Sequence, residues 1–183
     1  MKCFTCILIV SAVALISLPP EANAQKTYAL AIGGGAAIPV GTLSHTQTSG
    51  FNGLVALALG VADLPMGVRF DAIYNGFSHK DITSPPTNTY SFRVAGLLGN
   101  LLYALPGSTA KTYILAGGGL YNTKFDISGA KAENHWGLNA GLGVTFAVGP
   151  VSSFLESRYN FISREPAKGG VIHFVPITLG VMF

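Results

Sequence analysis

The 183-residue sequence is strongly apolar, with 49% hydrophobic and only 10% charged residues. An ordinary soluble domain has about 25% charged residues, so the surface of such a chain would be poorly solvated in water. The net charge of +3 is small for this length and is not clustered, which gives no support to nucleic-acid binding.

The N-terminal residues have the features of a secretory signal peptide. Lys2 supplies a positive charge, residues 7–18 form a short apolar core, and small residues precede Gln25. We therefore predict a helical signal peptide over residues 1–24, cleaved after Ala24, in an exported bacterial protein. The alternative is an uncleaved helical anchor, but the apolar core is shorter than the roughly 20 residues that a spanning helix needs.

The mature domain, residues 25–183, has no apolar run long enough for a spanning helix, because Gly, Asn, Ser or a charge interrupts every candidate. A closed β-barrel is the other architecture that satisfies every backbone group in lipid. Both cysteines, Cys3 and Cys6, lie in the signal peptide. We therefore predict one domain without a disulfide or a Cys-ligated metal.

Eight segments of the mature domain have alternating polarity or a glycine-rich β texture and are separated by turn residues. They are residues 27–39, 51–61, 66–77, 89–105, 112–125, 135–148, 151–162 and 171–183. Their lengths suit tilted membrane strands. We predict an all-β fold, an eight-stranded antiparallel up-and-down transmembrane β-barrel.

The connections between these segments alternate in length. Short ones follow the second, fourth and sixth segments, at residues 62–65, 106–111 and 149–150. Longer polar ones follow the first, third, fifth and seventh, at residues 41–50, 78–88, 126–134 and 163–170. Short turns on one side and long loops on the other are typical of outer-membrane barrels, which predicts periplasmic turns and termini.

The alternation assigns a lipid face and a lumen face to several strands. Segment 135–148 has Trp136 and Leu138 on one face, with Gly and Asn between them on the other. The predicted lumen charges are Arg69, Asp71, Arg93, Glu156 and Arg158. Because side chains fill a lumen of eight strands, we expect these charges to pair with one another. The alternative is a narrow, charge-lined ion path.

Aromatic residues near the strand ends are predicted to form interfacial girdles. They are Tyr28, Phe51, Tyr74, Tyr90, Tyr103, Tyr113, Trp136, Tyr159 and Phe161. Pro176 departs from the strand pattern because proline cannot donate to a ladder, so we expect a bulge or a local break there.

Several strings, in this order and spacing, resemble a known family: "AAIPVG", "GVRFDAIYNGF", "GNLLYALP", "YILAGGGLYN", "WGLNAGLGVTF", "FLESRYNF" and "FVPITLGVMF". The mature chain resembles the bacterial outer-membrane β-barrel domain family, often labelled porin family, of small eight-stranded barrels. Its terminal pattern resembles the signal recognised by the outer-membrane assembly machinery, and its residues are Val175, Ile177, Leu179, Val181 and Phe183. The resemblance does not imply a chemistry.

The sequence gives weak support to catalysis. Some small outer-membrane barrels act on lipid A with Ser, His and an acid, and here His45 and His79 follow Ser44 and Ser78 in polar loops. Adjacency in sequence is poor evidence for a nucleophile and its base. The histidines also lack the paired spacing of a metal site, so we assign no catalytic, cofactor or metal residue and predict no enzyme.

We therefore expect an integral outer-membrane protein, most simply a monomer, with a structural or surface-interaction role and a lumen plugged by side chains. Its expected partners are outer-membrane lipids and, during biogenesis, the barrel assembly machinery, without nucleic acid. A minor porin for small ions or solutes is the first alternative, and a lipid A-modifying barrel is the second. A soluble lipocalin-like barrel would need a polar exterior, which the apolar faces argue against.

Overall fold

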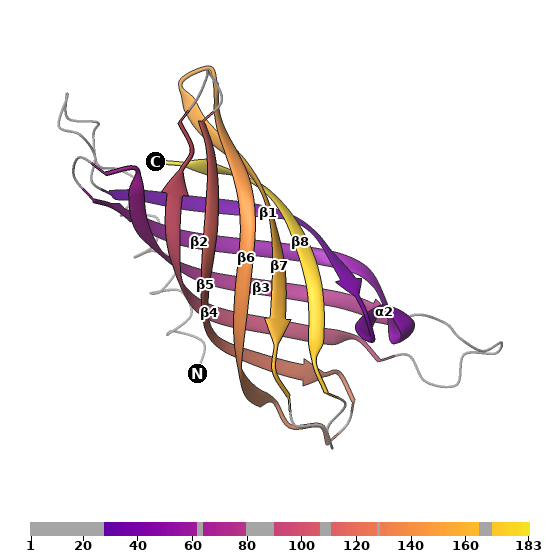
Figure 1. Ribbon diagram of the computed structural model, residues 1–183. Helices are drawn as coiled ribbons and strands as arrows, with labels where there is room; N and C mark the ends of the chain where they lie inside the picture. The colour runs from indigo at the N-terminus through magenta and orange to yellow at the C-terminus, as the bar shows by residue number, and fades with distance from the viewer. Residues whose placement is uncertain (1–27, 62–63, 80–89, 107–110, 128, 165–169) are drawn as a thin grey trace, which may run out of the picture.

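The computed structural model contains a closed antiparallel β-barrel of eight strands (Figure 1). It describes residues 28–61, 64–79, 90–106, 111–127, 129–164 and 170–183. The predicted signal peptide and its cleavage site at Ala24 and Gln25 lie outside the described residues. No helix in the described part of the chain is both long and apolar enough to cross a membrane.

The strands follow one another around the barrel in sequence order. They are β1 (Tyr28–Val40), β2 (Gln47–Gly60), β3 (Met66–His79), β4 (Phe92–Ala104), β5 (Lys111–Phe125), β6 (Glu133–Val148), β7 (Val151–Ile162) and β8 (Ile172–Met182). This order is that of an up-and-down barrel, as the alternating pattern predicts. The one short helix among the described residues, α2 (Leu43–Thr46), follows β1.

The connections divide the barrel into two ends. The turn end carries the connections β2–β3, β4–β5 and β6–β7 together with the C-terminus, and the loop end carries α2 and the other three connections (Figure 1). The structure differs from the predicted loop at residues 41–50, because α2 and the start of β2 occupy part of it. Polar residues there still pair with β3, from Gln47 opposite His79, and the register shifts between Thr48 and Phe51.

Pairing of β1 with β8 closes the barrel. Their register runs from Ala31 opposite Met182 to Val40 opposite His173. Two backbone hydrogen bonds extend it, since Phe183 N–H donates to Leu30 O at 2.9 Å and Leu30 N–H donates to Phe183 O at 3.2 Å. Each strand therefore has two neighbours, and the closed sheet presents no free strand edge.

The ladder between β7 and β8 is interrupted at the proline, as expected. Ser157 pairs with Ile177 and Asn160 pairs with Phe174, but the two positions between them are unpaired. The register is the same on both sides of this gap, so the irregularity is a local break and not a bulge. Pro176 lies within the gap and still takes its place opposite Ala37 of β1. The missing N–H of proline explains why only one of the two ladders is lost.

Alternate side chains point out of and into the barrel. Leu97 of β4 and Trp136 of β6 are each 70% exposed, and Leu138 of β6 is 65% exposed. A continuous wall of large exposed apolar side chains is unfavourable in water and suits lipid. Most of the hydrophobic core lies inside the barrel toward the loop end, and Ala31 and Phe154 extend it toward the turn end.

Candidate functional site

Four of the predicted lumen charges meet in the middle of the barrel. Arg69 and Asp71 alternate on the inward face of β3, and Glu156 and Arg158 do so on the inward face of β7. Their side chains are 6% exposed or less. We call these four residues the charged layer. Its two positive and two negative charges sum to zero, which is what burial of ions requires.

Each arginine of the charged layer contacts both carboxylates. Arg69 Nη1 lies 2.8 Å from Glu156 Oε2, and Arg69 Nε lies 2.9 Å from Asp71 Oδ1. Arg158 Nη1 lies 2.7 Å from Asp71 Oδ2, and its Nε contacts Glu156 Oε1. The result is a closed ring of four ion pairs, in which no single charge can be removed without leaving two buried partners incomplete.

The charged layer joins opposite walls of the barrel. In an eight-stranded cylinder β3 and β7 are four strands apart, so no backbone ladder connects them. The pairs Arg69–Glu156 and Asp71–Arg158 cross the lumen and supply that connection. The ring thus occupies the centre of the lumen, where an ion path would have to pass.

Neutral side chains also donate hydrogen bonds to the two carboxylates of the charged layer. Tyr113 Oη on β5 donates to Glu156 Oε2 at 2.7 Å, and Asn100 Nδ2 on β4 donates to Asp71 Oδ2 at 2.6 Å. Gly143 of β6 pairs with both Tyr113 and Glu156, so it lies between them in the sheet. A Cβ atom on Gly143 would overlap the Tyr113 ring. The glycine is therefore what lets the two inward side chains meet across the intervening strand.

Amides and hydroxyls form a second polar layer nearer the loop end. Asn52 Nδ2 donates to Asn75 Oδ1 at 2.9 Å, and Thr178 Oγ1 donates to Asn52 Oδ1. Tyr121 Oη donates to Asn160 Oδ1 at 2.9 Å. A void of only about 10 Å³ lies between this layer and the charged layer. It is no larger than the space needed for about one water molecule.

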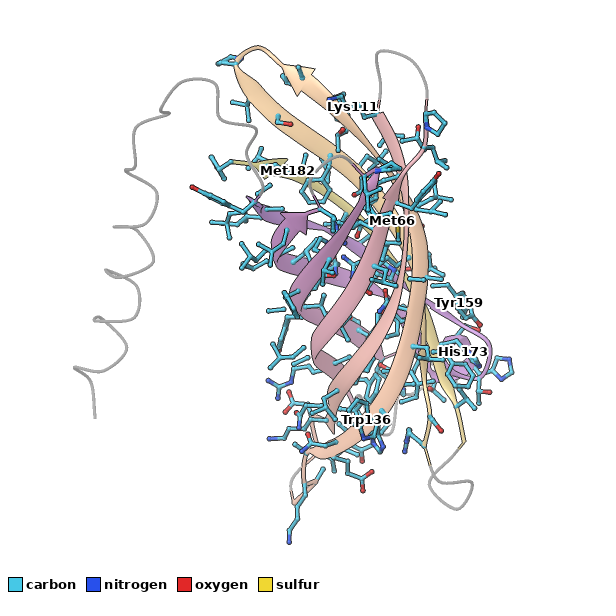
Figure 2. The ribbon with its side chains drawn as sticks, turned by 60° about the vertical axis from the view of Figure 1, so that its left-hand side comes forward. Met66, Lys111, Trp136, Tyr159, His173 and Met182 are labelled. Atoms are coloured by element: carbon cyan, nitrogen blue, oxygen red, sulfur yellow. The ribbon has the colours of Figure 1, made fainter. Side chains whose placement is uncertain are left out.

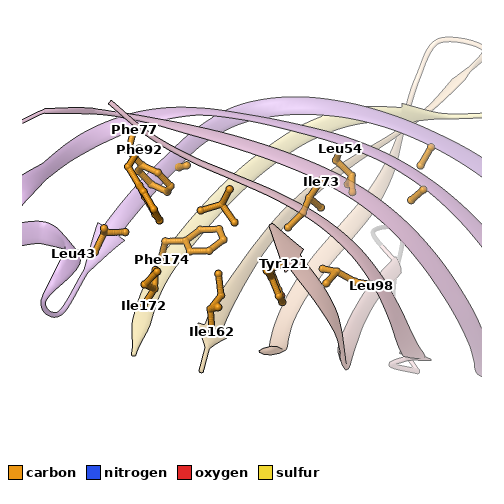
Figure 3. Packing of buried hydrophobic residues seen from close by; sticks show 14 of the residues in the cluster. Leu43, Leu54, Ile73, Phe77, Phe92, Leu98, Tyr121, Ile162, Ile172 and Phe174 are labelled. Atoms are coloured by element: carbon orange, nitrogen blue, oxygen red, sulfur yellow. The ribbon is translucent and has the colours of Figure 1, made fainter. Parts of the chain in front are cut away.

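Aromatic and aliphatic side chains pack inside the barrel beyond the amides, toward the loop end (Figure 3). Phe77 contacts Phe92 with a ring-centre distance of 6.1 Å and meets Phe174 edge-on at 5.6 Å. All three rings are 1% exposed or less. Ile162 and Ile172 are buried with them. We call these five residues, three phenylalanines and two isoleucines, the aromatic layer.

Arg93 does not belong to the charged layer, so the prediction that placed it in the lumen is wrong. On β4 the neighbouring Phe92 and Val94 point inward and are fully buried, which turns Arg93 outward. Its side chain is 40% exposed, and Nη2 lies 3.1 Å from Asp126 Oδ1. At the end of a strand, beyond the apolar wall, a cation can face outward in water.

Tyr113 is also placed differently from its prediction as a girdle residue. It points into the lumen and contacts Glu156, whereas the aromatic residues that flank the apolar wall point outward. Trp136 and Tyr159 are among these outward residues (Figure 2). Tyr159 Oη lies 2.8 Å from His173 Nδ1 on the outer wall.

Four residues of the predicted assembly signal lie on the outward face of β8, and the fifth, Phe183, follows the strand and is 52% exposed. Val175 and Val181 are half-buried, and Ile177 and Leu179 are exposed. His45 lies in α2, and His79 lies at the end of β3, opposite Gln47 of β2. Among the described residues no three His, Cys, Asp or Glu side chains gather in a metal-binding arrangement.

Sequence reasoning missed the aromatic layer and the neutral partners of the charges. Phe77 is an even number of residues away from Arg69 and Asp71 on β3, so its side chain points to the same side. Its inward direction could therefore have been deduced from β3 alone. The partners Tyr113 and Asn100 come from strands whose glycines obscure the alternation. That a tyrosine of β5 reaches across β6 depends on register, which the sequence does not state.

Comparisons with known proteins agree on the fold. No family model matches the sequence, and no curated protein matches it significantly. The solved structure of Neisserial surface protein A is similar, with a TM-score of 0.60 and 22% identity over 85% of this chain and 94% of that one. A major outer membrane protein from Thermus thermophilus has a TM-score of 0.57 and 14% identity over 85% of this chain and 98% of that one. The chain therefore has the fold of the small eight-stranded barrels of bacterial outer membranes.

Proposed function

We propose that the protein is an integral outer-membrane barrel with a structural or surface-interaction role, whose lumen does not conduct ions or solutes. The observation that carries this proposal is the stack of charged, amide and aromatic layers across the lumen. Its charges are paired within the barrel, so they are not left to coordinate a passing ion.

The apolar exterior supports residence in a membrane. Strands long enough to cross a bilayer at a tilt carry large apolar side chains outward, while the polar side chains of the same strands are buried within. Under this proposal the turn end faces the periplasm and the loop end faces the outside. The C-terminal strand would be read by the assembly machinery during insertion.

The interaction role is assigned to the loop end because barrel walls are constrained by lipid and pairing, whereas loops are not. The aromatic layer supports this division of roles. It gives the loop end a rigid base, since Leu43 of α2 is buried in the same cluster as Phe77 and Phe174. A surface held in this way can present loops to a partner without a path through the barrel.

Conductance in planar lipid bilayers tests the closed lumen. We expect the purified protein to give no steady current steps. The double variant Phe77→Ala with Phe174→Ala removes two rings of the aromatic layer but keeps the charged layer, so it should also remain silent. Adding Glu156→Gln should produce transient openings. The matched control is Phe51→Ala, because Phe51 is 58% exposed on the outer wall at the same end.

Steady ion-selective steps from the unmodified protein would contradict the closed lumen and favour the minor porin. A second assay addresses enzymatic activity: incubation with lipid A, followed by mass spectrometry of the lipid. We expect lipid A to be unchanged, and loss of its acyl chains would show that the barrel is an enzyme.

A further inference from the structure

At the turn end the lumen widens into a cavity of about 310 Å³. All eight strands contribute to its lining, and it extends from the mouth of the barrel to Arg69 and Tyr113. We call this space the vestibule. Binding sites for small molecules are concave, mostly apolar and roughly 300–1,000 Å³ in volume, so the vestibule is at the small end of that range.

Small inward side chains create the space. Ala29 and Ala31 on β1, Ala58 on β2 and Ala104 on β4 all line the vestibule. At inward positions of the loop end, β3, β4 and β8 carry phenylalanine and β7 carries isoleucine. The vestibule is therefore a consequence of residue choice on a barrel wall of uniform geometry.

The vestibule lining is mainly apolar. Leu102, Phe154 and Met182 line it together with the alanines. Apolar surface in contact with water is unfavourable, and an alkyl chain that displaces this water would gain the free energy of burial. The space from Met66 to Arg69 covers three residue steps of β3, or about 10 Å along the strand at roughly 3.3 Å per residue. This length, measured along the tilted strand, suits one alkyl chain of medium length.

A lysine at the mouth of the vestibule favours an anionic ligand. Among the described residues that line it, the charged ones are Lys111 and Arg69, and no acidic side chain is present. Arg69 lies at the closed end, where its guanidinium is already engaged by Asp71 and Glu156. Lys111 is exposed at the start of β5, at the mouth (Figure 2). A ligand would therefore place its apolar tail inside and its anionic head at the mouth.

We propose that the vestibule binds an amphipathic anion with a single alkyl chain of medium length, of the fatty-acid carboxylate class. Its tail lies between Ala58, Leu102 and Phe154, and its carboxylate lies beside Lys111. The site opens on the side of the barrel opposite to the loops, and it does not depend on whether the lumen conducts.

Equilibrium binding of radiolabelled decanoate to the full mature barrel in lipid nanodiscs tests this site. Empty nanodiscs measure partition into lipid, which is subtracted. We expect one saturable decanoate per barrel. Decanol should compete about two- to five-fold more weakly than unlabelled decanoate, the range for loss of an exposed ion pair, and decylammonium should compete more weakly still because its charge is repelled by Lys111. Hexadecanoate should also compete more weakly because its chain exceeds the depth of the vestibule.

Two variants locate the site. Ala58→Phe fills the vestibule and should reduce decanoate binding at least about ten-fold. Its matched control is Ala116→Phe, because Ala116 is exposed on the outer wall. This control variant should bind decanoate as tightly as the unmodified protein does. Folding of each variant is checked on a detergent gel, where a folded barrel migrates differently before and after boiling. If Ala58→Phe does not fold by this test, Ala104→Phe at the mouth takes its place.

A third variant tests the head-group contact. Lys111→Gln should weaken decanoate binding about two- to five-fold, the range for an exposed ion pair, and leave decanol competition unchanged. Lys124→Gln is the control, since Lys124 is exposed near the loop end. The proposal is overturned by non-saturable uptake, by equal binding to a folded Ala58→Phe barrel, or by equal competition from decylammonium.

Discussion

The two ends of the lumen are built on the same wall and filled in opposite ways. At the loop end, inward positions carry Phe77, Phe92 and Phe174, which pack against one another. At the turn end, inward positions carry alanines such as Ala31 and Ala58, and a cavity of about 310 Å³ remains. Strand parity decides which side chains enter a barrel, and side-chain volume decides whether the space is filled or left open.

The charged layer separates the two ends. It has the polarity of a pore lining, but every charge in the ring has two partners of opposite sign. Inward charges in a small barrel therefore do not by themselves indicate a channel. Their pairing across the lumen, from β3 to β7, is the more informative property.

Among the variants that test this comparison of the two ends, the largest expected loss of stability comes from breaking the charged layer that separates them. Glu156→Gln leaves Arg69 and Arg158 short of a buried negative charge and should lower the free energy of unfolding by about 3–5 kcal/mol. Urea unfolding in lipid vesicles, followed by fluorescence of Trp136, the only tryptophan of the sequence, measures it. The control is Asp126→Asn, which breaks an exposed pair with Arg93 and should cost less than about 1 kcal/mol. Equal losses in the two variants would contradict the account.

A smaller effect is expected where glycine lets Tyr113 meet Glu156. Gly143→Ala places a methyl group against the Tyr113 ring and should cost about 1–3 kcal/mol through overpacking. Gly99→Ala is the control, because a Cβ atom there meets nothing within 4 Å. The same unfolding assay compares them, and a neutral Gly143→Ala would mean that Tyr113 is not held against β6.

The smallest expected effect comes from the same Ala→Leu substitution made at each end of the lumen, which compares their packing directly. Ala37→Leu enters the packed loop end, where Ala37 is fully buried, and should cost about 1–3 kcal/mol. Ala58→Leu enters the vestibule, which has room for it, and should change stability by less than about 1 kcal/mol. Similar costs at both positions would show that the two ends are packed alike.

Much of the fold could be predicted because membrane barrels impose simple local rules. Two-residue alternation in β3 and β6, together with alternating connection lengths, indicated eight strands, and the closed barrel confirms this. The helix α2 escaped prediction because four residues carry no helical periodicity. The early start of β2 did so because Gln47 to Gly50 lie beyond the apolar wall, where polar residues can continue a strand.

The candidate site was predicted only in part, for a reason that concerns register. Parity within β3 and β7 identifies Arg69, Asp71, Glu156 and Arg158 as inward, since each strand carries a clear alternation. Arg93 was misplaced because polarity was taken as a sign of the lumen at a strand end where water is accessible from outside. Which inward residues share a level depends on the stagger between strands, and this is a property of the closed sheet.

The most direct test of the contrast between the ends uses single cysteines. In a mature chain without cysteine, Ala58→Cys places a thiol in the vestibule and Ala37→Cys places one beneath the aromatic layer. In intact lipid vesicles with the turn end exposed, a charged, membrane-impermeant thiol reagent should modify the first rapidly and leave the second unmodified until urea unfolds the barrel. Equal modification of both thiols in the folded protein would contradict a lumen that is open at one end and closed at the other.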